Sequence, residues 1–102
     1  MEYTYEQNDG SLTVSMPGEL DHHHAGTLIK DMDRLLQEHR ARILIFDFKN
    51  TVFMDSSGIG VILGRYKNMY YTSGKVIAIH LNDQIDKIFR LSGLHKIVEV
   101  QK

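Results

Sequence analysis

The sequence predicts a single α/β domain built on a mixed, mostly parallel β-sheet with helices. Two segments, residues 43–48 and 76–81, are almost continuously apolar, as expected for strands that are covered on both faces in a parallel sheet. Segments with the periodicity of helices precede and follow them. The expected element order is β-β-α-β-α-β-α-β, and such alternation predicts right-handed crossovers around one sheet.

The N-terminal region predicts a β-hairpin with one buried face. Apolar and polar residues alternate near Tyr3 and Tyr5 and again over residues 12–16. The sequence Asn-Asp-Gly at residues 8–10 lies between the two runs and is typical of a tight turn. Pro17 and Gly18 then end the second strand.

A long amphipathic helix is expected after the hairpin. Asp21 is well placed as its N-cap, because a carboxylate there can accept hydrogen bonds from the unpaired N–H groups of the first turn. Apolar residues then recur at the i, i+3, i+4, i+7 spacing of a helix that lies on a core, with mixed charges on the other face. The apolar positions are Ala25, Leu28, Ile29, Met32, Leu35 and Leu36.

Two further helical patterns alternate with the remaining strands. One follows the sequence Asp-Ser-Ser-Gly at residues 55–58 and runs to about Met69, before Ser73 and Gly74 break it. The other is short, has Asn82 as its N-cap and ends before Gly93. It is expected to bury Ile85, Ile88 and Phe89. Residues 97–100 predict a final strand.

Length and composition exclude several classes of function. A chain of 102 residues is one domain, 1–102, too short for a multidomain enzyme. Its 12 basic and 13 acidic residues exclude a strongly basic nucleic-acid binder. The absence of cysteine excludes a disulfide scaffold and a thiolate metal site. There is no signal-peptide pattern, and no apolar run approaches the roughly 20 residues that span a bilayer. We therefore expect a cytoplasmic protein with no nucleic-acid or membrane partner.

Residues 53–67, FMDSSGIGVILGRYK, form the most informative segment. They lead through two serines into the start of a helix, where unpaired N–H groups favour an anion. Gly58 and Gly60 leave the first turn uncrowded, so that another protein can approach Ser57 closely. The alternative is that Ser56 or Ser57 is an ordinary N-cap and that the glycines serve packing. Burial of the Asp47 carboxylate in an apolar strand is unfavourable unless the carboxylate is paired. Asp47 could lie at the end of the sheet near this turn.

Three enzymatic motifs do not fit this segment. A nucleophile elbow needs glycine two residues before the serine, where Asp55 and Met54 stand. A P-loop needs Gly-Lys followed by Ser or Thr, but Gly64 is followed by arginine, and Gly74 by lysine and valine. A dinucleotide site needs a third glycine where Leu63 stands. We expect no catalytic residue and no cofactor.

The histidines carry only weak signals. His22, His23 and His24 suggest a metal site, but consecutive helical residues point about 100° apart, whereas helical ligands favour i, i+3 or i, i+4 spacing. We therefore expect a solvated first turn and no metal. His80 and His95 stand alone on or near core elements and are expected to be packed or hydrogen-bonded.

Two segments together resemble a known family. GELDHHHA at residues 18–25 and FMDSSGIGVILGRYK at 53–67 resemble bacterial anti-sigma factor antagonists of the STAS domain family. The resemblance is strongest to the sporulation branch, which controls sigma factor F, and RLSGLHKIV at residues 90–98 is similar to the closing segment of that branch. The resemblance covers residues 12–100 and implies a STAS-type fold.

The resemblance implies a switch rather than an enzyme. In this family the second serine of the DSSG motif, here Ser57, is phosphorylated by a partner that is both a serine kinase and an anti-sigma factor. The unphosphorylated antagonist binds that partner and displaces the sigma factor, the phosphorylated one lets go, and a serine phosphatase restores it. Asp21 and Asp55 match acidic positions of the partner-binding surface, which would comprise Asp21, Asp55, Ser56, Ser57, Gly58 and Ile59.

Two alternatives and one departure accompany the resemblance. The chain could be a STAS regulatory module of another partner-switching pathway, such as general stress signalling, or a small enzyme that uses the Ser56–Ser57 turn. Family members commonly continue past the last strand into a further helix, whereas this sequence ends at Lys102. We expect the apolar surface that such a helix would cover to be exposed.

Overall fold

A five-stranded mixed sheet forms the centre of the computed structural model, which describes residues 3–101. The strand order is β1-β2-β4-β6-β7; β1 is antiparallel to β2, and the other neighbours are parallel. The α/β class and the mostly parallel sheet are therefore confirmed. In chain order the elements are β1 (Thr4–Asn8), β2 (Ser11–Ser15), β3 (Glu19–Leu20), α1 (His22–His39), β4 (Ile43–Asp47), β5 (Phe53–Met54), α2 (Ser56–Tyr71), β6 (Lys75–Ile79), α3 (Asp83–Ser92), the 3-10 helix η1 (Leu94–Lys96) and β7 (Glu99–Gln101).

The N-terminal hairpin pairs as predicted, but only β2 has the expected buried face, because every residue of β1, Tyr5 included, is exposed. β1 pairs with β2 in the register Asn8↔Ser11, so that only two residues connect the strands. Both of them, Asp9 and Gly10, have positive φ values of 48° and 87°. This is the geometry of a turn whose twist matches that of the flanking strands, and it explains why the sequence has aspartate followed by glycine there.

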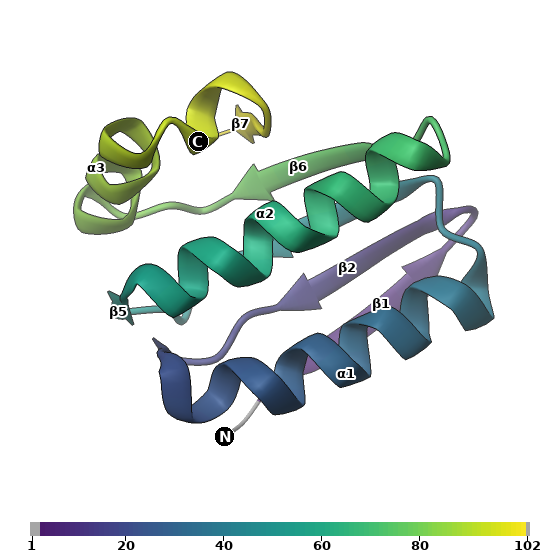
Figure 1. The fold of residues 1–102 in the computed structure, drawn as a ribbon, viewed down its shortest axis with the longest axis horizontal. Helices are drawn as coiled ribbons and strands as arrows, with labels where there is room; N and C mark the ends of the chain where they lie inside the picture. Colours follow the sequence, from purple (N-terminus) through teal and green to yellow (C-terminus); the bar gives the residue numbers. More distant parts are fainter. Residues whose placement is uncertain (1–2, 102) are drawn as a thin grey trace.

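The helices α1 and α2 lie side by side across one face of the sheet (Figure 1). Beneath them, alternate residues of β2, β4 and β6 are buried, because successive strand residues point to opposite faces. Burial of these side chains against the apolar faces of the helices supplies the main favourable term in folding. The buried strand residues are Leu12, Val14, Leu44, Phe46, Val76 and Ala78.

The opposite face of the sheet is less covered than predicted. Ile43 and Ile45 of β4 are only partly buried, and so are Ile77 and Ile79 of β6. The expectation that both strands are covered on both faces is therefore wrong. The continuous apolar sequence reflects one face packed against helices and a second face that carries a row of partly buried isoleucines.

The predicted helix ends are largely correct. Asp21 caps α1, with its side chain accepting a hydrogen bond from the backbone N–H of His24 at 3.2 Å. Asn82 caps α3 in the same way, accepting from Ile85 N–H at 2.9 Å, and Gly93 ends that helix at a φ of 83°. The final strand differs from the predicted range of residues 97–100, because residues 94–96 form η1 and β7 starts only at Glu99.

Two short strands complete the fold in a way that the strand and helix pattern did not predict. β3 and β5 pair in parallel as a separate two-stranded sheet, with the register Glu19↔Phe53 and Leu20↔Met54. They lie at the carboxyl ends of the main parallel strands, beside the N-terminal ends of α1 and α2 (Figure 1).

Candidate functional site

The pairing of β3 with β5 creates the corner that holds the serine turn. Leu20 and Met54 are register partners, and each is followed at once by an aspartate that begins a helix. The backbone N–H of Asp55 also donates to the Leu20 carbonyl at 3.3 Å. Two segments that are distant in sequence, and that are both part of the family resemblance, therefore meet at the N-terminal ends of α1 and α2.

Asp55, and neither serine, is the N-cap of α2. One oxygen of its carboxylate, Oδ1, accepts hydrogen bonds from the N–H groups of Ser57 at 2.8 Å and Gly58 at 3.4 Å. The alternative that Ser56 or Ser57 caps the helix is therefore wrong. Because the carboxylate binds these first-turn donors, the hydroxyls of both serines are left without a hydrogen-bond partner anywhere in residues 3–101.

The two glycines beside Ser57 have different roles. Gly58 is buried, and a Cβ there would lie 2.9 Å from the Leu20 carbonyl oxygen and closer still to the Met54 side chain. Gly60 is exposed, and a Cβ there would meet nothing within 4 Å. Gly58 therefore lets α2 close on β3 and β5, whereas Gly60 leaves open surface next to the turn.

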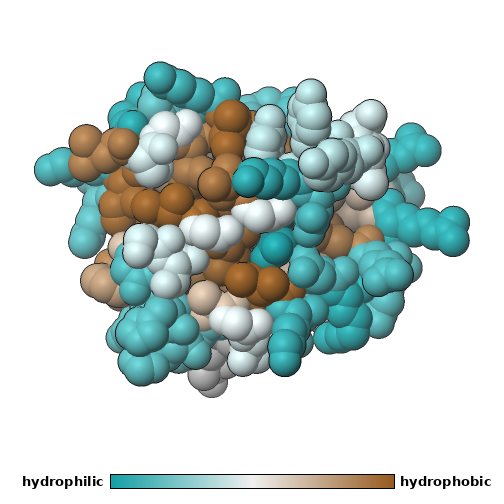
Figure 2. Space-filling view, in the orientation of Figure 1, coloured by the Kyte–Doolittle hydropathy of each residue, from teal (hydrophilic) through white to brown (hydrophobic). Residues whose placement is uncertain are grey.

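The accessible part of the corner is larger than the sequence indicated. Ser56 is exposed, and Ser57 and Ile59 are partly exposed. Before the turn, Val52 and Phe53 are 65% and 45% exposed. The sequence did not predict that these two side chains are exposed. Strand alternation could have identified Phe53, because its neighbour Met54 points inward. Hydrophobic side chains also gather over the N-terminal half of α2 and towards α3 (Figure 2).

The histidines at the start of α1 contact both helix caps. His24 Nδ1 lies 2.8 Å from Asp21 Oδ1 and 3.2 Å from the Glu19 carbonyl oxygen. His22 Nδ1 lies 4.0 Å from Asp55 Oδ2, and its ring is stacked beside that of His23, with the centroids 4.1 Å apart. The first turn is thus not simply solvated. Among residues 3–101, however, no group of three or more metal-ligating side chains is close enough to hold a metal ion.

The other candidate polar residues lie outside this corner. Asp47 Oδ1 contacts His80 Nδ1 at 2.9 Å and accepts from the Lys49 N–H at 2.9 Å, so this carboxylate is paired, but not with the serine turn. His95 Nδ1 donates to the Phe89 carbonyl at 3.3 Å. The prediction that His80 and His95 are hydrogen-bonded is confirmed.

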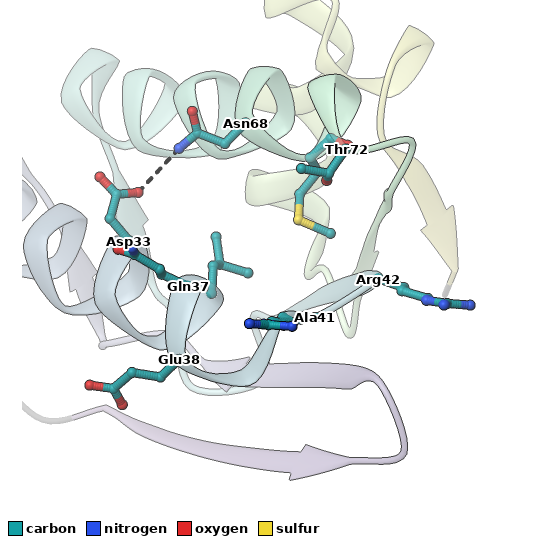
Figure 3. A pocket seen from close by; sticks show the side chains of 10 residues that line it. Asp33, Gln37, Glu38, Ala41, Arg42, Asn68 and Thr72 are labelled. Carbon is teal, nitrogen blue, oxygen red and sulfur yellow. Dashed lines mark hydrogen bonds between the residues drawn. The ribbon is translucent and has the colours of Figure 1, made fainter.

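A hollow at the opposite end of the two helices lies away from Ser57. It has a volume of about 950 Å³ and opens between the C-terminal halves of α1 and α2 (Figure 3). Asp33 and Asn68 face each other across it, joined by a 3.2 Å hydrogen bond from Nδ2 to Oδ1. Ser57 is instead on an open surface, which suits contact with another macromolecule better than enclosure of a small substrate.

The corner also lacks the arrangement of a serine nucleophile. Such a serine needs a general base within hydrogen-bond reach of its hydroxyl, and within residues 3–101 neither Ser56 nor Ser57 has one.

No helix in the described residues is long and apolar enough to cross a membrane.

Comparison with known proteins agrees with this architecture. The sequence matches the STAS domain profile over residues 2–102. An anti-sigma F factor antagonist of Paenibacillus polymyxa is 38% identical over 95 residues, which cover 93% of this chain and 81% of the relative. An anti-sigma-B factor antagonist of Bacillus subtilis is 26% identical over 95 residues, covering 93% and 85%.

Solved structures show the same fold. The unphosphorylated form of the anti-sigma factor antagonist SpoIIAA superposes with a TM-score of 0.86 at 25% identity, covering 99% of this chain and 89% of the other. The phosphorylated form of SpoIIAA, a Bacillus cell fate determinant, gives a TM-score of 0.78 with coverage of 99% and 92%. The chain, with its mixed sheet, its paired helix N-termini and its DSSG turn, belongs to the STAS domain family.

Proposed function

We propose that this protein is an anti-sigma factor antagonist that is switched by phosphorylation of Ser57. The unphosphorylated form binds an anti-sigma factor that is also a serine kinase, and thereby releases the sigma factor. Transfer of the γ-phosphoryl group of ATP to Ser57 Oγ, with release of ADP and a proton, ends that binding, and a serine phosphatase reverses it. The 38% identity to an anti-sigma F factor antagonist supports sigma factor F, and hence sporulation, as the pathway. Such a function belongs in the cytoplasm, where transcription takes place.

The observation that carries the proposal is the placement of Ser57. The residue is partly exposed and its hydroxyl has no hydrogen-bond partner in residues 3–101, while its backbone N–H is fixed by Asp55 at 2.8 Å. A kinase can therefore reach the oxygen without unfolding the turn. The N-terminus of α2 tolerates the added charge of about −1.5 to −2, because helix N-termini favour anions.

The surface around Ser57 supplies the remaining contacts with the partner. Asp21 and Asp55 place carboxylates on either side of the junction between the helices, and Ser56 and Ile59 flank the phosphoacceptor. Gly58 is buried, so we assign it the role of shaping the turn rather than touching the partner. A phosphate added here meets acidic neighbours and must be desolvated on docking, which opposes binding at this one interface without refolding the domain.

The first experiment tests the modified residue. The protein is incubated with ATP, with and without the anti-sigma F factor of Paenibacillus polymyxa, and the phosphorylated peptide is identified by mass spectrometry. We expect one phosphate, only in the presence of the anti-sigma factor, and its loss in Ser57→Ala but not in the matched control Ser56→Ala. Phosphate on Ser56 alone, or none in the wild type, contradicts the proposal.

The second experiment tests the switch. Binding to the same anti-sigma factor is measured calorimetrically for wild type, Ser57→Ala and Ser57→Asp. We expect Ser57→Ala to bind as wild type does and Ser57→Asp to bind at least tenfold more weakly. Equal affinities of Ser57→Ala and Ser57→Asp would refute the electrostatic account. Backbone amide shifts should change only around Ser57 on phosphorylation, whereas changes spread across the sheet would indicate a conformational switch.

A general stress pathway is the second candidate. It is favoured by the 26% identity to an anti-sigma-B factor antagonist, which covers 93% of the chain. Offering equal amounts of an anti-sigma F factor and an anti-sigma-B factor in one pull-down separates the two pathways. We expect preferential capture of the anti-sigma F factor.

A further inference from the structure

The corner that holds Ser57 contains histidines that the proposed switch does not use. His22 is the first residue of α1, and the pairing of β3 with β5 places it beside the first turn of α2. Its Nδ1 lies 4.0 Å from Asp55 Oδ2, while the other oxygen of the same carboxylate, Oδ1, accepts from the Ser57 N–H at 2.8 Å. A single carboxylate thus separates the His22 imidazole from the backbone of the phosphoacceptor.

The charged groups of this corner are unequally paired. Asp21 and Asp55 are both N-caps, and each binds N–H groups of its own helix. His24 is held by Asp21 at 2.8 Å, and its side chain is 32% exposed. His23 stacks against His22. Apart from that ring contact, His22 has in residues 3–101 only the long contact with Asp55, and its side chain is 69% exposed, so the imidazole can turn towards a new anion.

We infer that His22 is the intramolecular counter-ion of phosphorylated Ser57. In the unphosphorylated protein the carboxylate of Asp55 is the anion nearest to His22 in the described structure. Phosphorylation adds a second and stronger anion to the first turn of α2, next to that carboxylate, and a protonated His22 then pairs with it. The inference rests on the proposed function only in taking Ser57 as the modified residue.

The pairing has a defined consequence for the switch. It offsets part of the repulsion between the phosphate and Asp55, so the phosphorylated form is retained as a folded, stable species until the phosphatase acts. It also couples the phosphate to a proton, because histidine is the side chain that changes charge close to neutral pH. By linkage, the phosphate raises the pKa of His22 by the same amount that the imidazolium lowers the second pKa of the phosphate.

The test needs no kinase. Phosphoserine is inserted at position 57 during translation, and the protein and its unphosphorylated counterpart are titrated by proton NMR of the six histidine rings. We expect the pKa of His22 to rise by about 1 pH unit on phosphorylation, as for an opposite charge within about 4–6 Å. The rings of His39, His80 and His95, whose partners are Tyr5, Asp47 and the Phe89 carbonyl and not residues of the serine corner, serve as internal controls. A change at His22 no larger than theirs overturns the inference.

A reciprocal measurement on the phosphate guards against an indirect effect. Phosphorus NMR follows the second pKa of phosphoserine 57 in the wild-type background, in His22→Asn and in the matched neighbour variant His23→Asn. We expect that pKa to rise by about 1 pH unit in His22→Asn and to change little in His23→Asn. Equal changes in both variants, or none, contradict the pairing. Because the phosphate is installed without a kinase, failure here is distinct from failure of the anti-sigma factor to phosphorylate Ser57.

Discussion

The two ends of the helix layer are built on different principles. At the N-terminal ends of α1 and α2, the paired strands β3 and β5, two aspartate caps and a buried glycine fix the backbone and leave Ser57 accessible. At the C-terminal ends, a hollow of about 950 Å³ opens over an ion pair between Arg65 and Asp33. The proposed site is at the accessible corner, where the backbone of Ser57 is held by hydrogen bonds, and not at this hollow.

The C-terminal end also contains a buried charge. Arg65 is 7% exposed, and its Nε lies 3.0 Å from Asp33 Oδ1. Within residues 3–101, neither Nε nor Nη1 has an aligned hydrogen-bond partner. Coulombic attraction to Asp33, rather than a directed hydrogen bond, therefore compensates for the burial of this guanidinium. The serine corner, by contrast, relies on hydrogen bonds of 2.8–3.4 Å that backbone N–H groups donate to the Asp21 and Asp55 side chains.

The largest effect should come from filling the space at Gly58. We expect Gly58→Ala to lower the free energy of unfolding by about 3 kcal/mol, because its Cβ would collide with the backbone of Leu20 and the side chain of Met54. Gly60→Ala is the matched control and should raise stability by about 0.5–1 kcal/mol, since its Cβ meets nothing. Urea unfolding measures both. Similar effects of the two substitutions would show that α2 does not close on β3 as described.

The next effect tests the far end of the helices. Asp33→Ala should lower the free energy of unfolding by about 2 kcal/mol, because it leaves the buried charge of Arg65 without a partner. Glu38→Ala is the control. It removes an exposed partner of Arg34 at 3.4 Å on the same helix and should cost less than about 0.5 kcal/mol. Chemical denaturation compares the two, and equal costs would mean that Arg65 is solvated.

A smaller effect separates hydrogen bonding from charge at the serine corner. We expect Asp55→Ala to lower the free energy of unfolding by about 1 kcal/mol through loss of the cap, whereas Asp55→Asn, which keeps an acceptor oxygen, should cost a few tenths, about 0.3 kcal/mol. Thermal unfolding of both variants at one pH is sufficient. If Asn is as harmful as Ala, the negative charge rather than the cap stabilises the turn.

The smallest effect on stability at neutral pH should come from Tyr3, which contacts the middle of α1. The Tyr3 hydroxyl donates to Asp31 on α1, and burial, together with this carboxylate, raises the pKa of Tyr3 to about 12. Tyr3→Phe should cost about 0.5–1 kcal/mol at pH 7. Because the folded pKa lies above the unfolded value of 10.0, the stabilisation is complete below pH 10 and is lost as the pH rises towards 12.

The check is to measure stability against pH for both proteins. Wild type should lose stability between pH 10 and 12 more steeply than Tyr3→Phe, so that the two curves converge. Parallel curves over that range would show that the Tyr3 hydroxyl is not held by Asp31.

The features that were predictable from the sequence are local ones. The Asp-Gly turn of the hairpin, the Asp21 and Asn82 caps and the Gly93 helix end each depend on residues within about one turn of one another. The apolar periodicity of α1 likewise names its buried face correctly, since Ala25, Leu28, Met32 and Leu35 are buried. The DSSG segment likewise predicts a helix that starts at an accessible serine turn, and the structure has both.

The features that only the tertiary structure decided depend on chain segments that are far apart in sequence. The difference between Gly58 and Gly60 follows from how closely β5 and α2 approach β3. The same approach brings His22 to Asp55. Local pattern specifies each helix and its start, but the pairing energy of β3 with β5 sets how the two helix starts face each other, and no periodicity within either segment contains that information.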